Sequence, residues 1–197
     1  MKKTRRFILL FICIILSAQA VEVFTTEPGF ESLFNGRDLT GWCFRTGDKA
    51  DADRVDLFDG KVTTPDGRYA ARDGVLIVHP RAPRKIQKIF TQREFPRDFV
   101  LRLEFRAAVN ADSGIYVRGP QLQCRDYLVA GPYKGLKKYR PQDWNEIEVV
   151  VTEGVARCTC NGEVLEAALK LPATGPIGLE GDRDQMEYRH IRIKELP

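Results

Sequence analysis

FVLRLEFRA, residues 99–107, alternates apolar and charged side chains almost without a fault. Phe, Leu and Ala occupy the odd positions, while Arg, Glu and Arg occupy positions 102, 104 and 106. In a β-strand, successive side chains point to opposite faces, so a period of two separates an apolar face from a charged one. The segment therefore predicts a strand with one face in a core and the other in water, as in antiparallel sheets.

Further strand patterns follow this segment along the chain. Residues 147–151 alternate in the same way, and residues 155–160 form a return strand after a turn at Glu153-Gly154. Asn161-Gly162 is a strong two-residue hairpin signal. Only residues 163–169 hint at a helix. Many short strands separated by Gly and Pro predict an all-β sandwich or jelly roll in one domain. Shorter strands are predicted at 74–78, 177–179 and 188–193.

SGIYVRGPQLQCRD, residues 113–126, predicts two strands joined by a Gly-Pro turn. Alternation places Tyr116 and Arg118 on one face of the first strand, and Gln121 and Gln123 on one face of the second. Phenol, guanidinium and amide groups held in fixed directions suit a neutral polar ligand that has hydroxyl and carbonyl groups. The alternative is a half-solvated strand pair that binds nothing.

The first 20 residues have the organisation of an export signal. Four basic residues precede an unbroken apolar run over residues 7–16, and Ala18-Gln19-Ala20 supplies small residues for cleavage. An apolar run of 10 residues is too short for a stable membrane anchor. We therefore expect residues 21–197 to form a single exported domain, periplasmic or extracellular, with no membrane anchor.

Removal of this segment changes the charge of the chain. The signal contains 4 of the 31 Lys and Arg residues and none of the 27 Asp and Glu residues. The mature chain therefore has 27 residues of each sign and a formal net charge of 0. A chain with balanced charge has no general attraction for nucleic acid or anionic lipid, so neither is expected as a partner.

Four cysteines remain in the mature chain, at positions 43, 124, 158 and 160. A disulfide between Cys158 and Cys160, two apart on one strand, would be badly strained. Buried thiols are expected. The alternative is two disulfides, each of which joins one of the first two cysteines to one of the last two. One Cys-x-Cys motif with two distant histidines does not have metal-ligand spacing. We expect no metal and no cofactor, and the sequence gives no support for a divalent cation.

A basic loop, AGPYKGLKKYR at residues 130–140, interleaves Tyr133 and Tyr139 with lysines such as Lys137. Tyrosine rings and ammonium groups in such a loop can stack on a sugar or cover a cleft. The alternative is an exposed loop that is merely soluble.

Short motifs follow one another along the rest of the chain. They are FESLFNGRDLTGW (30–42), FVLRLEFR (99–106), DSGIYVR (112–118), DWNEIE (143–148), NG (161–162), GPIGL (175–179) and YRHIRIKEL (188–196). In this order, and over nearly all of the mature chain, they resemble the 3-keto-disaccharide hydrolase family. The resemblance implies an exported concanavalin A-like jelly-roll sandwich of two antiparallel sheets, and a hydrolase that acts on 3-keto glycosides.

The reaction that the resemblance implies is an elimination followed by hydration. A ketone at carbon 3 acidifies the hydrogen on carbon 2, so that a base can remove it. The resulting enolate expels the group on carbon 1, and water adds to the alkene. Such a reaction needs a general base, a group that stabilises the oxyanion and a proton donor. It does not need the paired carboxylates of ordinary glycosidases.

Family members often have the pattern Glu-x-Gln-x-x-Asp after the SGI strand. Here the pattern falls on Gln121, Gln123 and Asp126, and the Gln121 amide cannot accept a proton. The resemblance therefore implies Asp126 as the base, with Arg118 as the partner of the ketone or oxyanion. The residues expected to bind the substrate are Tyr116, Gln121, Gln123, Lys137 and Glu180.

Several other polar and aromatic residues are expected to be structural. Glu104 is expected to pair with arginines on neighbouring strands, and His190 to make a structural hydrogen bond. Trp42 and Trp144 are expected in the core.

A non-catalytic carbohydrate-binding jelly roll is the second hypothesis, and a cell-surface protein-interaction domain is the third. An enzyme is expected to gather Arg118, Gln123, Asp126 and at least one further acid or lysine in one concave pocket. A binding module is expected to have a shallower groove with aromatic platforms and no perturbed carboxylate.

Overall fold

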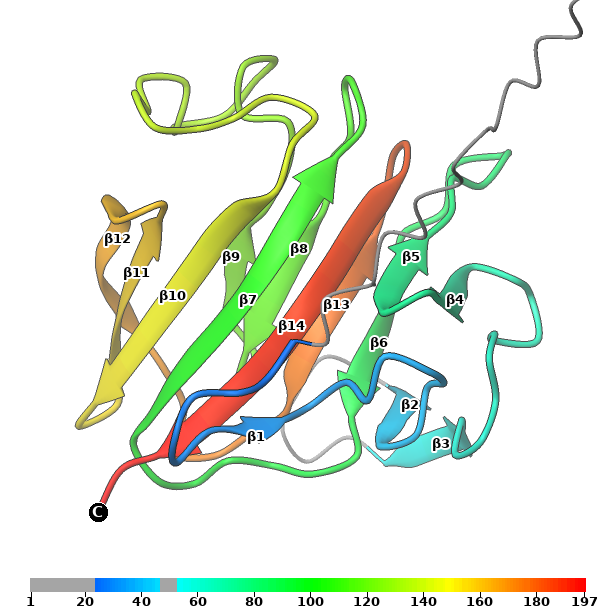
Figure 1. Cartoon of the computed structure of the whole chain (residues 1–197), viewed down its shortest axis with the longest axis horizontal. Helices are drawn as coiled ribbons and strands as arrows, with labels where there is room; N and C mark the ends of the chain where they lie inside the picture. Colours follow the sequence, from blue (N-terminus) through cyan, green and yellow to red (C-terminus); the bar gives the residue numbers. More distant parts are fainter. Residues whose placement is uncertain (1–23, 47–52) are drawn as a thin grey trace, which may run out of the picture.

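The computed structural model describes residues 24–46 and 53–197, so the expected signal at residues 1–20 lies outside the described residues. Two β-sheets pack face to face, with the larger sheet towards the viewer in Figure 1. Within the described ranges, regular structure consists of strands alone. No helix in these ranges is long and apolar enough to cross a membrane. The predicted all-β sandwich is confirmed.

The larger sheet has eight strands in the order β12-β11-β10-β7-β14-β5-β4, and β1 also pairs with β14. Neighbouring strands in this sheet are antiparallel. The strands are β1 (Glu31–Ser32), β4 (Tyr69–Arg72), β5 (Val75–Val78), β7 (Phe99–Ala107), β10 (Asn145–Thr152), β11 (Val155–Cys160), β12 (Glu163–Lys170) and β14 (Met186–Glu195).

The smaller sheet has six strands in the order β3-β2-β6-β13-β8-β9, and its neighbouring strands are also antiparallel. These are β2 (Trp42–Arg45), β3 (Arg54–Leu57), β6 (Gln87–Thr91), β8 (Gly114–Val117), β9 (Gln121–Gln123) and β13 (Ile177–Gly181). The strand pair predicted within residues 113–126 is thus confirmed as β8 and β9.

The prediction for β7 is confirmed, whereas the helix predicted at residues 163–169 is wrong. In β7, buried and half-buried residues alternate along the whole strand. Residues 163–169 instead belong to β12, which pairs with β11. In this register Glu163 lies opposite Cys160, and Lys170 lies opposite Val155. The turn at Asn161-Gly162 returns the chain beside β11, so the backbone of residues 163–169 forms hydrogen bonds with β11. A helix this short would be only marginally stable without such a partner.

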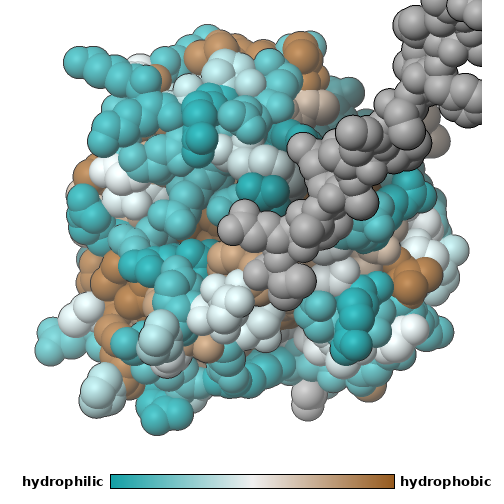
Figure 2. All heavy atoms as spheres, in the orientation of Figure 1, coloured by the Kyte–Doolittle hydropathy of each residue, from teal (hydrophilic) through white to brown (hydrophobic). Residues whose placement is uncertain are grey.

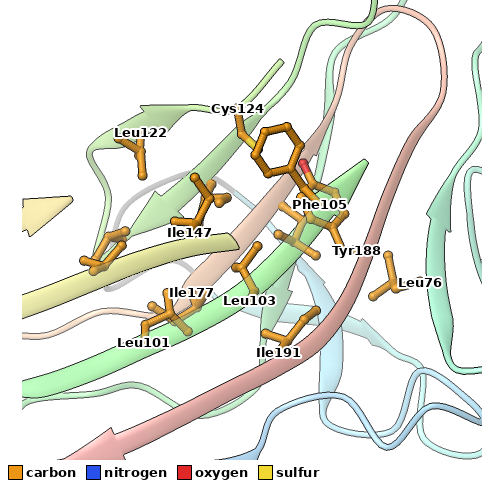
Figure 3. Packing of buried hydrophobic residues seen from close by; sticks show 14 of the residues in the cluster. Leu76, Leu101, Leu103, Phe105, Leu122, Cys124, Ile147, Ile177, Tyr188 and Ile191 are labelled. Carbon is orange, nitrogen blue, oxygen red and sulfur yellow. The ribbon is translucent and has the colours of Figure 1, made fainter. Parts of the chain in front are cut away.

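The core lies between the two sheets. Figure 3 shows Leu101, Leu103 and Phe105 of β7 packed beside residues of the opposite sheet such as Ile177, and all four are fully buried or nearly so. Trp42 is also buried, as expected, and its indole N–H donates to the Leu33 carbonyl at 2.9 Å. All four cysteines in the described ranges are buried thiols, which confirms that prediction.

Charged cross-strand pairs cover the outer face of the larger sheet, which Figure 2 shows as largely hydrophilic. Glu104 accepts a hydrogen bond from Arg189 at 2.6 Å, and its other carboxylate oxygen lies 3.3 Å from His190 Nδ1. The expected structural roles of Glu104 and His190 are therefore confirmed. Trp144 is not in the core but half-buried on this face, with Arg106 and Arg189 over its ring. It precedes the buried Asn145, so alternation directs it outward.

Candidate site on the outer face of the six-stranded sheet

Arg118 and Asp126 lie at opposite ends of β8. The Asp126 main-chain N–H donates to the Ala111 carbonyl, before the strand begins, whereas the Arg118 N–H donates to Pro176 after the strand has ended. The seven steps along the chain from Ala111 to Arg118 span about 23 Å at roughly 3.3 Å per step in extended conformation. The expectation that these two side chains converge in one pocket is therefore wrong.

The Arg118 side chain closes one end of the sandwich. It is only 2% exposed, and its two terminal nitrogens donate to the carbonyls of Pro172 (3.3 Å) and Arg97 (2.5 Å). Its guanidinium also packs over the Phe99 ring. The φ angle of Arg118 is 52°, which interrupts the strand alternation and turns its side chain away from the face that Tyr116 occupies. Arg118 therefore has a structural role, in which it connects the segments around Arg97 and Pro172.

Asp126 is buried and engaged by groups from several loops. Its carboxylate accepts hydrogen bonds from the Asn110 main-chain N–H (3.2 Å), the Tyr139 hydroxyl (3.4 Å) and the Gln142 amide (3.4 Å). These bonds tie the loop after β7 to the basic loop and the residues that follow it. Asp126 is thus placed to stabilise loops, and no described contact joins it to Tyr116, Gln121 or Glu180.

Lys137 lies beside the β11–β12 hairpin. Its main-chain N–H donates to the Glu163 carboxylate at 3.0 Å, and the next carbonyl, of Lys138, accepts a bond from the Asn161 amide at 2.7 Å. The Tyr133 hydroxyl donates to Glu166 of β12. The basic loop is therefore fixed to the edge of the larger sheet, and the structure does not join Lys137 to the other predicted substrate-binding residues.

Three of the predicted substrate-binding residues do meet, on the outer face of the six-stranded sheet. Tyr116 of β8 lies opposite Gln121 of β9, and β8 pairs with β13, the strand that contains Glu180. The Tyr116 hydroxyl donates to one carboxylate oxygen of Glu180 at 2.7 Å, and the Gln121 amide donates to the other at 3.1 Å. A buried carboxylate is thus held by two neutral donors from neighbouring strands.

Two glycines make room for these side chains. A Cβ atom on Gly114 would lie 2.1 Å from Gln121 Nε2, and one on Gly178 would lie 2.5 Å from the Phe90 ring. Gln121 can therefore lie across β8 towards Glu180 only because position 114 has no side chain. Gln123 lies opposite Gly114 in the same register, so it shares this face with Gln121.

Lys88 of β6 is a member of the cluster that the sequence did not reveal. It lies opposite Glu180 in the β13–β6 register, and its ammonium group is 4.3 Å from the centre of the Tyr116 ring. Residues 87–91, QKIFT, have no clean alternation, so this strand was not predicted. A lysine next to a glutamate on another strand becomes visible only when the register is known.

The environment of Glu180 changes its acidity. Glu180 is only 6% exposed, and this burial raises the pKa of its carboxyl above the usual value. The charge of Asp182 raises the pKa further, while the Tyr116 and Gln121 hydrogen bonds and the Lys88 charge oppose the shift. A carboxylate with a raised pKa is a stronger base, and such perturbed groups are frequent at functional sites.

A layer of ion pairs borders the cluster beyond Glu180. The Arg84 guanidinium donates to both carboxylate oxygens of Asp182, at 2.5 Å each, and the buried Arg125 lies 3.3 Å from Asp112. In residues 24–46 and 53–197, no group of three or more His, Cys, Asp or Glu side chains could hold a metal ion. The expectation that the protein uses no metal or cofactor stays a prediction.

The chain matches the model of the 3-keto-alpha-glucoside-1,2-lyase-like domain over residues 29–194. It therefore belongs to this family, which confirms the resemblance seen in its motifs. None of the curated proteins compared matches the chain.

Solved structures share the fold. A Parabacteroides distasonis ATCC 8503 protein described as a "putative glycosyl hydrolase" has a TM-score of 0.61 and 18% sequence identity, over 86% of this chain and 94% of that one. A second protein from the same organism, with the same description, has a TM-score of 0.53 and 20% identity, over 68% and 92% of the two chains. At such identities the likeness shows the jelly-roll fold alone.

Proposed function

We propose that the protein cleaves 3-keto glycosides by eliminating the group on carbon 1 and then adding water to the alkene. The observation that supports this most is the buried Glu180 carboxylate, which contacts Tyr116 and Gln121 and lies beside Lys88. Membership of the lyase-like family supports the same chemistry.

In this proposal, Glu180 removes the hydrogen from carbon 2 of the sugar. A carboxylate has about four lone-pair sites, and Tyr116 and Gln121 use two of them, so acceptor capacity remains for the incoming proton. The electrons of the broken C–H bond form an enolate, whose negative charge the Lys88 ammonium can stabilise. The carbon 1–oxygen bond then breaks, and the protonated Glu180 returns its proton to the leaving oxygen.

The base is thus assigned to Glu180 in place of Asp126. The family pattern has a glutamate at the position of Gln121, and in this chain the Gln121 amide lies 3.1 Å from the Glu180 carboxylate. Strand β13 therefore supplies a carboxylate next to the position where β9 has lost one. We also propose that residues 1–20 direct export to the periplasm or the extracellular space.

A non-catalytic carbohydrate-binding module is the second candidate. It is favoured by the fact that both oxygens of Glu180 already accept hydrogen bonds, as in a carboxylate that only orients neighbouring side chains. In that case Tyr116, Gln121 and Gln123 would bind sugar hydroxyls without chemistry.

Incubation of the purified protein with a 3-keto disaccharide tests the proposal. We expect release of free sugar, and none from the same disaccharide with a hydroxyl at carbon 3, because only the ketone acidifies the hydrogen on carbon 2. Calorimetry on the same samples separates the candidates. Heat of binding without sugar release would favour the binding module, and equal cleavage of both disaccharides would contradict the elimination.

The pH dependence of activity should report the acidity of Glu180. A base must be deprotonated, so kcat/KM is expected to fall as the pH drops through the pKa of Glu180, which lies above the ordinary 4.5. Arg84→Ala removes the partner of Asp182, and the uncompensated Asp182 charge should move this acid limb to higher pH. Arg183→Ala, which removes a partner of Asp112, is the matched control and should leave the limb in place. An acid limb that is the same in all three proteins would argue against Glu180 as the titrating base.

Asp126→Asn should affect stability more than catalysis. The carboxylate now accepts hydrogen bonds from an N–H group and a hydroxyl, whereas an amide nitrogen is a donor and leaves one of these groups without an acceptor. We therefore expect a loss of about 1–3 kcal/mol in the free energy of unfolding. Urea titration measures this loss, and kcat of the folded variant should stay within about twofold of the original. Abolished turnover in a well-folded Asp126→Asn protein would return the role of base to Asp126.

A further inference from the structure

The register between β13 and β8 changes at Glu180. Leu179 lies opposite Ile115, whereas the next pairing is an isolated bridge between Arg183 and Asp112. Residues 180–182 therefore face only residues 113–114, which means that β13 has one extra residue there. Such a β-bulge kinks a strand and redirects its side chains, and bulges are enriched beside active sites. Against β6 the register of β13 stays regular through Gly181.

Buried side chains hold the carbonyl groups around this bulge. The Ser113 hydroxyl donates to the Glu180 carbonyl at 2.6 Å, and the Arg68 guanidinium donates to the Asp182 carbonyl at 2.9 Å. The Tyr69 hydroxyl lies 2.7 Å from the Gln87 carbonyl of β6 and 3.2 Å from the Leu179 carbonyl. Of these contacts, only the one from Ser113 acts on the residue that supplies the proposed base.

The Ser113 hydroxyl is in turn oriented from the other sheet. Its oxygen lies 2.9 Å from the hydroxyl of Tyr188, a residue of β14. A serine hydroxyl has one proton, and Ser113 donates it to the Glu180 carbonyl, so Tyr188 must be the donor in this second bond. Both residues are fully buried, and Figure 3 shows Tyr188 among the apolar side chains of the core.

Packing alone does not explain this chain of hydroxyls. Phenylalanine would fill the place of Tyr188, and a buried hydroxyl is unfavourable unless it is hydrogen-bonded. The two bonds satisfy both hydroxyls, and they connect the larger sheet, through the core, to the backbone of Glu180. A fully satisfied buried network of this kind fixes one local geometry.

We propose that Ser113 and Tyr188 are positioning residues for Glu180, with Tyr188 orienting the Ser113 hydroxyl and Ser113 holding the bulge that aims the carboxylate at Tyr116 and Gln121. The inference rests on the proposed function of Glu180 as the base. Neither residue touches the substrate in this account. Both act only through the Glu180 backbone.

A direct test titrates the Glu180 carboxyl by NMR in protein labelled with ¹³C-glutamate, with the signal assigned by its loss in Glu180→Gln. The charged and titratable groups around Glu180 that every variant keeps are Lys88, Arg84, Asp182, Tyr116 and Tyr69. Burial raises the pKa of Tyr188 well above its usual value, so its replacement by phenylalanine removes a hydrogen bond but no charge. We expect Tyr188→Phe to move the titration towards the ordinary value, because a loosened carboxyl gains water. Tyr139→Phe is the matched control, since it also removes a buried tyrosine hydroxyl but one that bonds to Asp126, and it should titrate as the original does.

Kinetics and a second variant complete the test. We expect Tyr188→Phe to lower kcat about 10- to 100-fold with KM nearly unchanged, since a misaimed catalytic group can lose as much as 100-fold. Ser113→Ala should have the same effect, and the double variant should lose no more than either single one, because Tyr188 acts through Ser113. Thermal unfolding confirms that each variant is folded.

The outcomes separate this inference from the proposed function. A Glu180 titration in Tyr188→Phe that matches both the original and Tyr139→Phe would overturn the positioning role. If the titration shifts but the original protein cleaves no 3-keto glycoside, positioning stands and the proposed function fails. Additive losses in the double variant would also overturn the inference, because they would mean that the two residues act independently.

Discussion

Glu180→Gln is expected to lower kcat on a 3-keto disaccharide by about 10²–10⁴-fold, the usual contribution of a general base. The amide keeps the shape of the side chain and can still contact Tyr116 and Gln121, so the fold should persist. Burial opposes ionisation of Glu180, and a neutral amide avoids that penalty. The measurement is kcat under saturating substrate, with near-UV circular dichroism to confirm folding.

The contact between Gln121 and Glu180 offers a sharp control. Because their side chains lie 3.1 Å apart, Gln121→Glu in the Glu180→Gln background restores one carboxylate at nearly the same place. We expect this double variant to recover part of the lost kcat. Gln121→Glu alone should place two carboxylates together and raise the pKa of the pair, which would slow turnover near neutral pH. Undiminished turnover by Glu180→Gln would remove Glu180 from the mechanism.

Arg118→Ala should produce the largest loss of stability among the predicted site residues, at about 3 kcal/mol or more. The substitution leaves a cavity beside Phe99 and two carbonyl groups, of Pro172 and Arg97, without their donor. Because Arg118 lies at the end of β8 remote from Asp126 and outside the Glu180 cluster, kcat of the folded variant should change little. Urea unfolding and steady-state kinetics on the same preparation measure the two effects.

Arg97→Ala is the matched control for this experiment. The Arg97 side chain is 69% exposed and pairs with Glu195 at the surface, so its loss should change stability by less than about 0.5 kcal/mol. A stable Arg118→Ala protein without activity would contradict the structural role of Arg118. It would support the oxyanion role that the sequence suggested.

Local patterns in the sequence located several strands and some residues of the site, but not the order in which the strands pair. Alternation of polar and apolar residues located β7 and the β8–β9 pair, because period two depends only on neighbouring residues. It also placed Tyr116 and Gln121 among the residues of a ligand site, and the structure brings both to Glu180. The alternation pattern gave the wrong direction for the Arg118 side chain, because a positive φ angle at this residue interrupts the strand. An arginine rarely adopts such an angle, so the residue type gives no sign of it.

The role of Glu180 could not be read from the chain. The strand predicted at residues 177–179 ended one residue before it, whereas β13 extends to Gly181. Glu180 meets Tyr116 and Gln121 only because the sheet has the order β13-β8-β9, and Lys88 joins them because β6 lies on the other side of β13. Strand order and bulges depend on contacts between segments that are remote in sequence, so local patterns do not determine them.

A single-turnover comparison of two substrates tests the mechanism at Glu180 most directly. One 3-keto disaccharide has hydrogen on carbon 2 of the oxidised sugar, and the other has deuterium there. If Glu180 removes this atom, the deuterated substrate should be cleaved several-fold more slowly, and Glu180→Gln should cleave neither at a comparable rate. Equal rates for the two substrates, with deuterium fully retained in the released sugar, would show that the bond on carbon 2 never breaks.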